Sequence, residues 1–217
     1  MDVNKAFKLM HKNRKDNQKK GEAGENISLA LAQKYTSGRD DCIILHSYKY
    51  PYYVDEFEEV LPGNIKYIDK EFKTLQKESY SDEIDLVIIT AYRIFAIEVK
   101  ARLGKWLIYD HWAKQNSKMV DKSPVAQAEK HARHLYATIH EYIPDGNPKY
   151  IIPVVVYVDK SEIKDTRSKE FKNYVAVCTA NTFIKKLKML ENPLKYNIET
   201  KELLEFMLEV GEGTVYK

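Results

Sequence analysis

Two apolar runs joined by a tight connection dominate the middle of this chain. They are residues 83–90, which read EIDLVIIT, and residues 94–100, which read IFAIEVK. Both are rich in β-branched residues and are of strand length, so they predict two neighbouring strands of a β-hairpin. Because their apolar side chains need cover, any fold of this chain has to build a sheet around this hairpin and pack other elements against it.

Three charged residues interrupt the hairpin. Asp85 starts the first apolar run, and Glu98 and Lys100 end the second. Side chains two positions apart in a strand share a face, so Glu98 and Lys100 project together, and the hairpin returns Asp85 beside them. A buried carboxylate needs a partner, and carboxylate oxygens are ligands that Mg²⁺ prefers. The pattern is compatible with a divalent-cation site and equally with a plain ion pair of Lys100 with a carboxylate at a strand end.

Size and charge limit the class of protein only loosely. A length of 217 residues suits one domain, and the formal net charge of +3 is too small to establish an anionic partner. Residues 1–20 carry seven Lys or Arg against two Asp. This basic segment is either an arm or helix that contacts phosphates or a solvated, frayed terminus.

Cys42 and Cys178 lie far apart, each inside an apolar run, which predicts buried free thiols. No apolar run approaches the roughly 20 residues that span a bilayer, and the N-terminus lacks the apolar core of a signal peptide. We therefore expect a cytoplasmic protein without a membrane partner.

The remaining periodicities alternate between helix and strand. Residues 123–127 combine a Ser N-cap with Pro at the first helical position, which predicts a helix start, and residues 144–146 end that helix. Pro153 favours an edge or a bulge in its strand. Helices are expected over 21–35, 181–190 and 200–210, strands over 42–46, 104–109, 151–158 and 174–178, and an inserted loop or subdomain over 47–81. This order predicts an α/β fold with a mixed central sheet flanked by helices.

Three blocks of the sequence resemble a known family. They are residues 21–25 (GEAGE), the hairpin with Asp85 and the Glu98-Val99-Lys100 triplet, and residues 123–127 (SPVAQ) with His131. The hairpin resembles the PD-(D/E)XK nuclease superfamily, and the combination resembles its NERD (nuclease-related) domain over about residues 21–158. The resemblance implies a restriction-endonuclease-like αβββαβ core. The expected organisation is a basic segment 1–20, a nuclease-like domain 21–190 with the insertion 47–81, and a helical extension 191–217 of the same domain.

The resemblance also implies roles for individual residues. Asp85 and Glu98 would bind Mg²⁺ or Mn²⁺ with the carbonyl of Val99, and Lys100 would position or activate the attacking water. Gln127, near a helix N-terminus, would contact water, Lys100 or phosphate. From the first helix, Glu25 would complete the metal environment, and Glu22 is a second candidate for this role.

The implied activity is metal-dependent hydrolysis of DNA phosphodiester bonds that leaves 5′-phosphates. A binding module that keeps the fold and cleaves nothing is the alternative, and RNA stays open as a substrate. Arg102, Lys105, Lys19 and Lys20 are the expected nucleic-acid contacts. His111 and Trp112 either line a groove or serve the structure, and we expect His134 to be exposed. The sequence carries no indication of oligomeric state.

Overall fold

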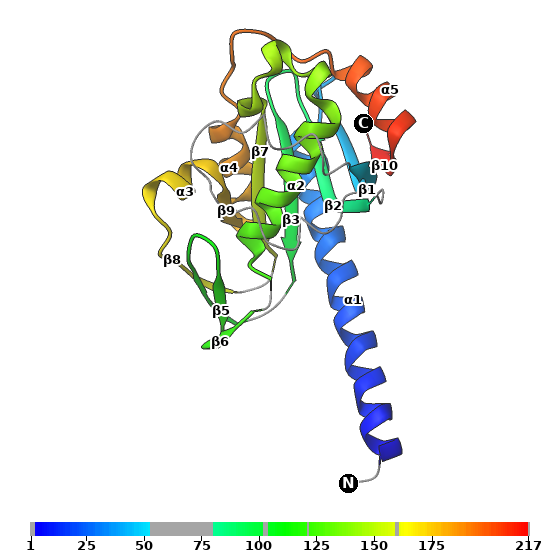
Figure 1. Cartoon of the computed structure of the whole chain (residues 1–217), viewed down its shortest axis with the longest axis vertical. Coiled ribbons are helices and arrows are strands. Elements are labelled where there is room, and N and C mark those ends of the chain that lie inside the picture. Colours follow the sequence, from blue (N-terminus) through cyan, green and yellow to red (C-terminus); the bar gives the residue numbers. More distant parts are fainter. Residues whose placement is uncertain (1–2, 53–79, 102–103, 121, 159–160, 217) are drawn as a thin grey trace.

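The structure is a computed structural model that describes residues 3–52, 80–101, 104–120, 122–158 and 161–216. Its centre is a six-stranded mixed sheet with the order β10-β1-β2-β3-β7-β9 (Figure 1). Strands β10, β1, β2 and β3 pair antiparallel, whereas β3, β7 and β9 pair parallel. The strands are β1 (Ile43–Tyr52), β2 (Tyr80–Ile89), β3 (Ile94–Lys100), β7 (Ile151–Tyr157), β9 (Ala176–Thr179) and β10 (Glu212–Tyr216).

Helices cover both faces of this sheet. One face packs against α2 and α5, and the other packs against α1 and α4. The helices are α1 (Val3–Thr36), α2 (Pro124–Ile139), α3 (Lys169–Tyr174), α4 (Phe183–Leu190) and α5 (Thr200–Val210). The predicted α/β class is confirmed, and α1, β1, β2, β3, α2 and β7 follow one another in the order of the αβββαβ core.

A second, four-stranded sheet follows directly on β3. Its order is β6-β5-β4-β8, with β4 (Lys105–Ile108), β5 (Ala113–Gln115), β6 (Lys118–Met119) and β8 (Glu162–Asp165). Trp106 and Ile108 of β4 are buried against α2 and β7 in a cluster that includes Val125 and Tyr157. The small sheet is thus attached to the end of the large one at which β3 and β7 finish (Figure 1).

The central hairpin opens into a fork. Pairing between β2 and β3 runs from Ile89–Ile94 to Leu86–Ile97 and then stops. Beyond that point β2 continues along β1 as far as Tyr80, while β3 continues along β7 as far as Lys100. Two strands that are neighbours at the turn therefore have different partners at their far ends. Asp85 and Glu98, the next residues outward, stand on opposite arms of the fork.

The structure corrects several sequence expectations. The first helix begins at Val3 rather than near residue 21, so the basic segment and the GEAGE block belong to one helix. Residues 212–216, expected in a helical extension, form the edge strand β10 beside β1. His134 is buried, with 3% of its surface exposed, because α2 is covered more widely than its periodicity indicates.

Other expectations are confirmed or refined. Helix α2 begins at Pro124 as predicted, although the Ser123 side chain makes no capping hydrogen bond. Strand β7 is interior, yet its pairing with β9 starts only at Val154, so Pro153 has a neighbouring strand on one side alone. This half-edge position tolerates the missing N–H. The segment 47–81 begins and ends in the paired strands β1 and β2, and its residues 53–79 lie outside the described residues.

Both cysteines are buried free thiols, as expected, and burial raises the pKa of each to about 12. None of the helices described here has a stretch that is both long and apolar enough to cross a bilayer.

Candidate active site

Asp85 lies at an irregular point of the sheet. The ladder between β1 and β2 skips the position at which Asp85 faces Ser47, and Ser47 has a left-handed backbone with φ of 50°. The Asp85 Oδ2 atom accepts a hydrogen bond of 2.6 Å from the backbone N–H of Val99 across the fork. The side chain thus replaces the strand-to-strand bond that is lost where β2 and β3 separate. This explains how a carboxylate is tolerated inside a strand.

Glu98 lies one step beyond the last β2–β3 pair, opposite Asp85, and is 5% exposed. Its Oε1 atom accepts a hydrogen bond from the Lys100 ammonium, which projects from the same face of β3. Its Oε2 atom lies 3.3 Å from Nδ1 of His131 on α2. Both oxygens of this buried carboxylate are therefore engaged by groups that carry or can carry positive charge.

The two carboxyl groups are held in opposite electrostatic states. Burial and the nearby charge of Glu98 raise the pKa of Asp85 to about 7, although the Val99 N–H and Lys100 act against this shift. Burial also raises the pKa of Glu98, but the His131 hydrogen bond and the charge of Lys100 outweigh it and hold that pKa below its usual value. Ionisation of Asp85 is therefore disfavoured in the metal-free site, a condition that a bound cation would relieve.

Glu25 reaches this region from α1. Its carboxylate is half-buried, and its charge adds to the rise in the pKa of Asp85. The Oε2 atom of Glu25 lies 3.9 Å from Nε2 of His46 on β1, and that nitrogen is buried without a hydrogen-bond partner among the described residues. Glu25 therefore stands close enough to influence the charge of Asp85, and its part in a metal environment stays a prediction.

Gly24 explains how α1 comes so near. A Cβ atom added at Gly24 would lie 2.4 Å from Cβ of Ala101 and 3.0 Å from Cγ2 of Val158, far inside van der Waals contact. The residue after Lys100 therefore packs directly on the helix backbone. Only glycine at this position lets the neighbouring Glu25 approach the end of β3.

Gln127 lies in the first turn of α2 and is half-buried. It precedes His131 by four residues and so shares the helix face from which His131 contacts Glu98. The free N–H groups and the positive end of the helix dipole are found at this same turn. A role of Gln127 beside the hairpin carboxylates stays a prediction.

The remaining predicted residues are spread more widely. Glu22 is exposed on α1, one turn before Glu25, and Lys19 is exposed nearer the N-terminus of the same helix. Lys105 is exposed at the start of β4 and pairs with Glu162 at 3.2 Å. The side chain of Lys20 and the whole of Arg102 lie outside the described residues.

The donor set suits a hard cation with few protein ligands. In the part of the chain that the structure describes, no group of three or more His, Cys, Asp or Glu side chains is arranged to hold a metal ion. Mg²⁺ is commonly held by one or two carboxylates and keeps several waters, so Asp85 and Glu98 with the adjacent Val99 backbone are a sufficient set. The raised pKa of Asp85 is compatible with this fit, since a cation would favour the ionised carboxylate.

Sequence reasoning missed His131 and His46 as members of the site. His131 belongs to the third block of the family resemblance, and its four-residue spacing from Gln127 was the available signal. His46 ends a short apolar run and gave no signal, because its proximity to Glu25 arises from α1 crossing the sheet. His111 packs edge-on against Phe171 at 4.8 Å, which gives it a structural contact.

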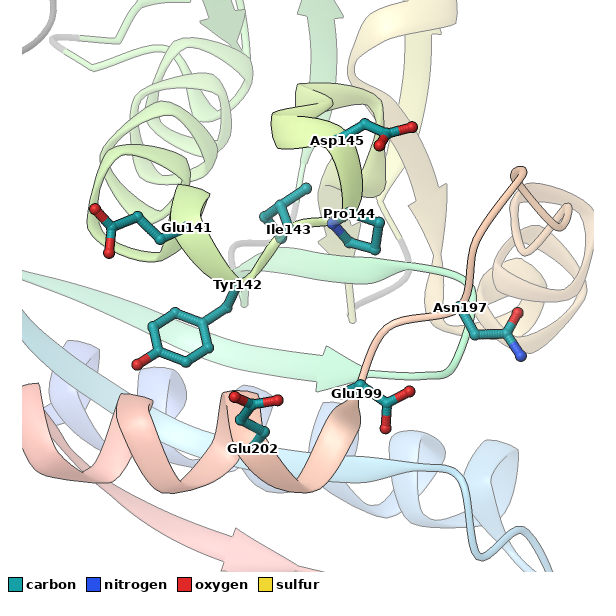
Figure 2. A pocket seen from close by; sticks show the side chains of 8 residues that line it. All are labelled: Glu141, Tyr142, Ile143, Pro144, Asp145, Asn197, Glu199 and Glu202. Atoms are coloured by element: carbon teal, nitrogen blue, oxygen red, sulfur yellow. The ribbon is translucent and has the colours of Figure 1, made fainter.

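A pocket elsewhere on the molecule has a different character (Figure 2). It lies beyond the C-terminal end of α2, about 20 Å along the helix from Gln127 at 1.5 Å per residue. Four carboxylates surround it, from Glu141, Asp145, Glu199 and Glu202. An acidic lining repels phosphate, so the fork and not this pocket is the candidate active site.

The fold and the fork together define an α/β protein with a restriction-endonuclease-like core, in which an Asp and a Glu-x-Lys triplet meet at the end of a hairpin. The family model of the nuclease-related domain (NERD) matches residues 20–158, which contain α1 from Lys20, the fork and β7. The chain belongs to this family and is a nuclease-related protein. No curated protein and no solved structure matches it significantly.

Proposed function

We propose that this protein is a metal-dependent nuclease that hydrolyses DNA phosphodiester bonds at the fork between β2 and β3. One observation carries the proposal: the half-buried carboxylate of Asp85 and the buried carboxylate of Glu98 stand one step beyond the last β2–β3 pair, and the Lys100 ammonium from the same triplet binds Glu98. Family membership supports a nuclease-related role, and the fork supplies the groups that such a role requires.

Asp85 and Glu98 would hold Mg²⁺ or Mn²⁺, with the carbonyl of Val99 as a further oxygen ligand. When bound, the ion would supply Lewis-acid polarisation of the phosphate and lower the pKa of a coordinated water. Lys100 would orient the attacking water and balance negative charge that develops on the phosphate. Glu25 would act from α1 through the water shell, and Gln127 would donate to phosphate or water at the start of α2.

His131 would act as a positioning residue. It fixes the orientation of Glu98 through the contact at 3.3 Å and keeps that carboxylate ionised. Groups that orient a metal ligand from behind typically change metal affinity or activity by about 10–100-fold when they are removed. Glu98 would then be deprotonated and held in one rotamer before the ion binds.

The test is cleavage of supercoiled plasmid and of linear DNA by the purified full chain in Mn²⁺ or Mg²⁺. We expect nicking or digestion that is lost on chelation and in the variants Glu98→Gln and Lys100→Ala. Glu129→Gln is the matched control, since Glu129 is a buried carboxylate on α2 that lies two residues from His131 and hence on a different helix face. Equal cleavage by all four proteins would mean that the activity comes from a contaminant.

A non-cleaving nucleic-acid-binding module is the alternative. Calorimetric titration with Mn²⁺ separates the two: saturable binding that Glu98→Gln abolishes supports the nuclease. DNA binding in EDTA without metal binding or cleavage supports the module. Competition between DNA and RNA of one sequence decides the substrate class.

A further inference from the structure

The small sheet presents one face away from the core. In β4, Trp106 and Ile108 are buried while Lys105 is 78% exposed at its side chain, so alternate residues point inward and outward. Register carries the outward direction to the neighbouring strands. Leu107 pairs with Lys114 on one side and with Lys164 on the other, which places the three side chains in one outward row.

This lysine row (Lys114, Leu107 and Lys164) is positively charged. The adjacent position of the same face holds the pair Lys105–Glu162, which is neutral as a unit. The ion pairs found among the described residues engage neither Lys114 nor Lys164. Asp165, next to Lys164, is bound by Arg167 at 2.9 Å on the opposite side of the strand. The face therefore keeps two uncompensated ammonium groups about two strand spacings, or ~10 Å, apart.

An aromatic pair fixes one of these charges. The rings of Tyr109 and Trp112 stack with centroids 3.6 Å apart at the turn between β4 and β5. The Lys114 ammonium lies 5.5 Å from the centroid of the Trp112 ring. This is a cation–π distance, so the ammonium is oriented before any ligand arrives and loses less side-chain entropy on binding.

The row is also near the candidate active site. Leu107, the centre of the row, follows Lys100 by seven residues, so the Cα atoms of Lys100 and Leu107 are at most about 25 Å apart. Hydrogen bonds from Val158 N–H to the Lys100 carbonyl and from Glu162 N–H to the Gly104 carbonyl pair the chain after β3 with the chain after β7 at both ends of this stretch. In duplex DNA about 25 Å corresponds to roughly seven base pairs.

We propose that the outward lysine row of the small sheet binds the phosphate backbone of the DNA substrate within about one helical turn of the cleaved bond. The inference rests on the proposed function for its ligand. Lys114 and Lys164 each contact one phosphate, and neither side chain reads a base. The contacts add affinity and hold the duplex in one direction across the fork, without adding sequence preference.

The test measures binding apart from cleavage. A fluorescein-labelled 20-base-pair duplex is titrated with the full chain in EDTA over a series of salt concentrations. The variant Lys114→Ala/Lys164→Ala should bind more weakly, and its slope of log affinity against log salt should be shallower by about 2, since each duplex phosphate contact contributes about 0.9. The control Lys185→Ala/Lys188→Ala removes two exposed lysines from α4 and should bind like the wild type.

Two further measurements keep the outcomes apart. Thermal melting checks folding, and Lys114→Gln/Lys164→Gln replaces the alanine variant if that variant melts early. Hydrolysis of bis(p-nitrophenyl) phosphate in Mn²⁺ measures the activity of the candidate active site on a substrate that does not reach the lysine row. This activity should be unchanged when the two lysines are replaced. Equal salt slopes for the row variant and the wild type overturn this inference even if DNA is cleaved. A shallower slope with no cleavage supports the surface and overturns the proposed nuclease activity.

Discussion

Nδ1 of His131 lies 3.3 Å from Oε2 of Glu98, and this contact joins the helix layer to the end of the hairpin. It keeps the pKa of Glu98 below its usual value despite burial. We expect His131→Ala to lower the cleavage rate by about 10–100-fold and to weaken Mn²⁺ binding. Rates and calorimetry measure this, with His140→Ala, at the C-terminal end of the same helix, as the control. Wild-type metal affinity in His131→Ala would remove the positioning role.

Gly24 and Gly21 form a matched pair on one helix. Gly24→Ala places a Cβ atom 2.4 Å from Cβ of Ala101, so α1 has to shift, at a cost of about 1–3 kcal/mol in the free energy of unfolding. We also expect lower nuclease activity, because Glu25 moves with the helix. At Gly21 a Cβ atom meets nothing within 4 Å, and Gly21→Ala should be neutral or stabilising by up to about 1 kcal/mol. Denaturant titrations compare the two; equal stabilities would disprove the close approach.

The raised pKa of Asp85 has a signed consequence for stability. The folded metal-free protein holds a proton on Asp85 up to about pH 7, whereas the unfolded chain releases it near its ordinary pKa of about 3.9. Over that interval the folded state binds more protons, so this group lowers the free energy of unfolding as pH rises. Asp85→Asn should remove this loss of stability, so the variant should have a higher melting temperature than the wild type at pH 8 in EDTA. A variant that gains nothing at pH 8 relative to pH 5 would contradict the shift.

Metal binding should release the proton that the folded, metal-free protein holds on Asp85. Because Mn²⁺ takes the ionised carboxylate, its affinity for the wild type should rise between pH 6 and pH 8 and level off above the pKa of Asp85. Calorimetry in buffers of different ionisation enthalpy measures the protons released, and about one is expected below pH 7. Glu25→Gln should shift the rise to lower pH, since the charge of Glu25 helps to raise that pKa.

Arg39 and Glu191 anchor the C-terminal end of α1 to the end of α4. The guanidinium donates to both carboxylate oxygens at 2.8 and 2.5 Å, and Tyr35 donates to the same carboxylate. Burial raises the pKa of Glu191, but Arg39 and Tyr35 outweigh it and hold that pKa below its usual value. We expect Glu191→Gln to cost about 1.5–3 kcal/mol at pH 7. The stabilisation by Glu191 is lost as pH falls below about 4.5, so wild type and variant should converge in acid. Denaturant midpoints at pH 7 and at about pH 3 test this.

Local patterns in the sequence were sufficient for the elements that carry the site. The hairpin and the start of α2 follow from β-branched runs and from Ser123-Pro124, which act within a few residues. Strand β10 was not predictable, because residues 212–216 become a strand only by pairing with β1. The start of the first helix was predicted near residue 21 because Gly21 reads as a helix boundary. The polar residues before Gly21 also favour helix, and the helix begins at Val3.

Within the site, the proximity of residues that share one element could be predicted from the sequence, whereas contacts between elements could not. Asp85, Glu98 and Lys100 share a hairpin, so their proximity followed from strand alternation. The contact of His131 with Glu98 depends on how α2 lies across the sheet, and the approach of Glu25 depends on a glycine contact 77 residues away in sequence, from Gly24 to Ala101. Packing of that kind has no local signature.

The fork between β2 and β3 bears on how the protein folds. Glu98 takes its place only when β3 lies beside β7, whose residues follow it by 57 positions (Glu98 with Val155), and Asp85 is held by the β1–β2 pair. Long-range parallel pairing forms slowly because a large loop has to close first. The ability to bind Mn²⁺ should therefore appear late in refolding, after most helical circular dichroism has returned, and partly folded chains would carry no competent site that could damage DNA.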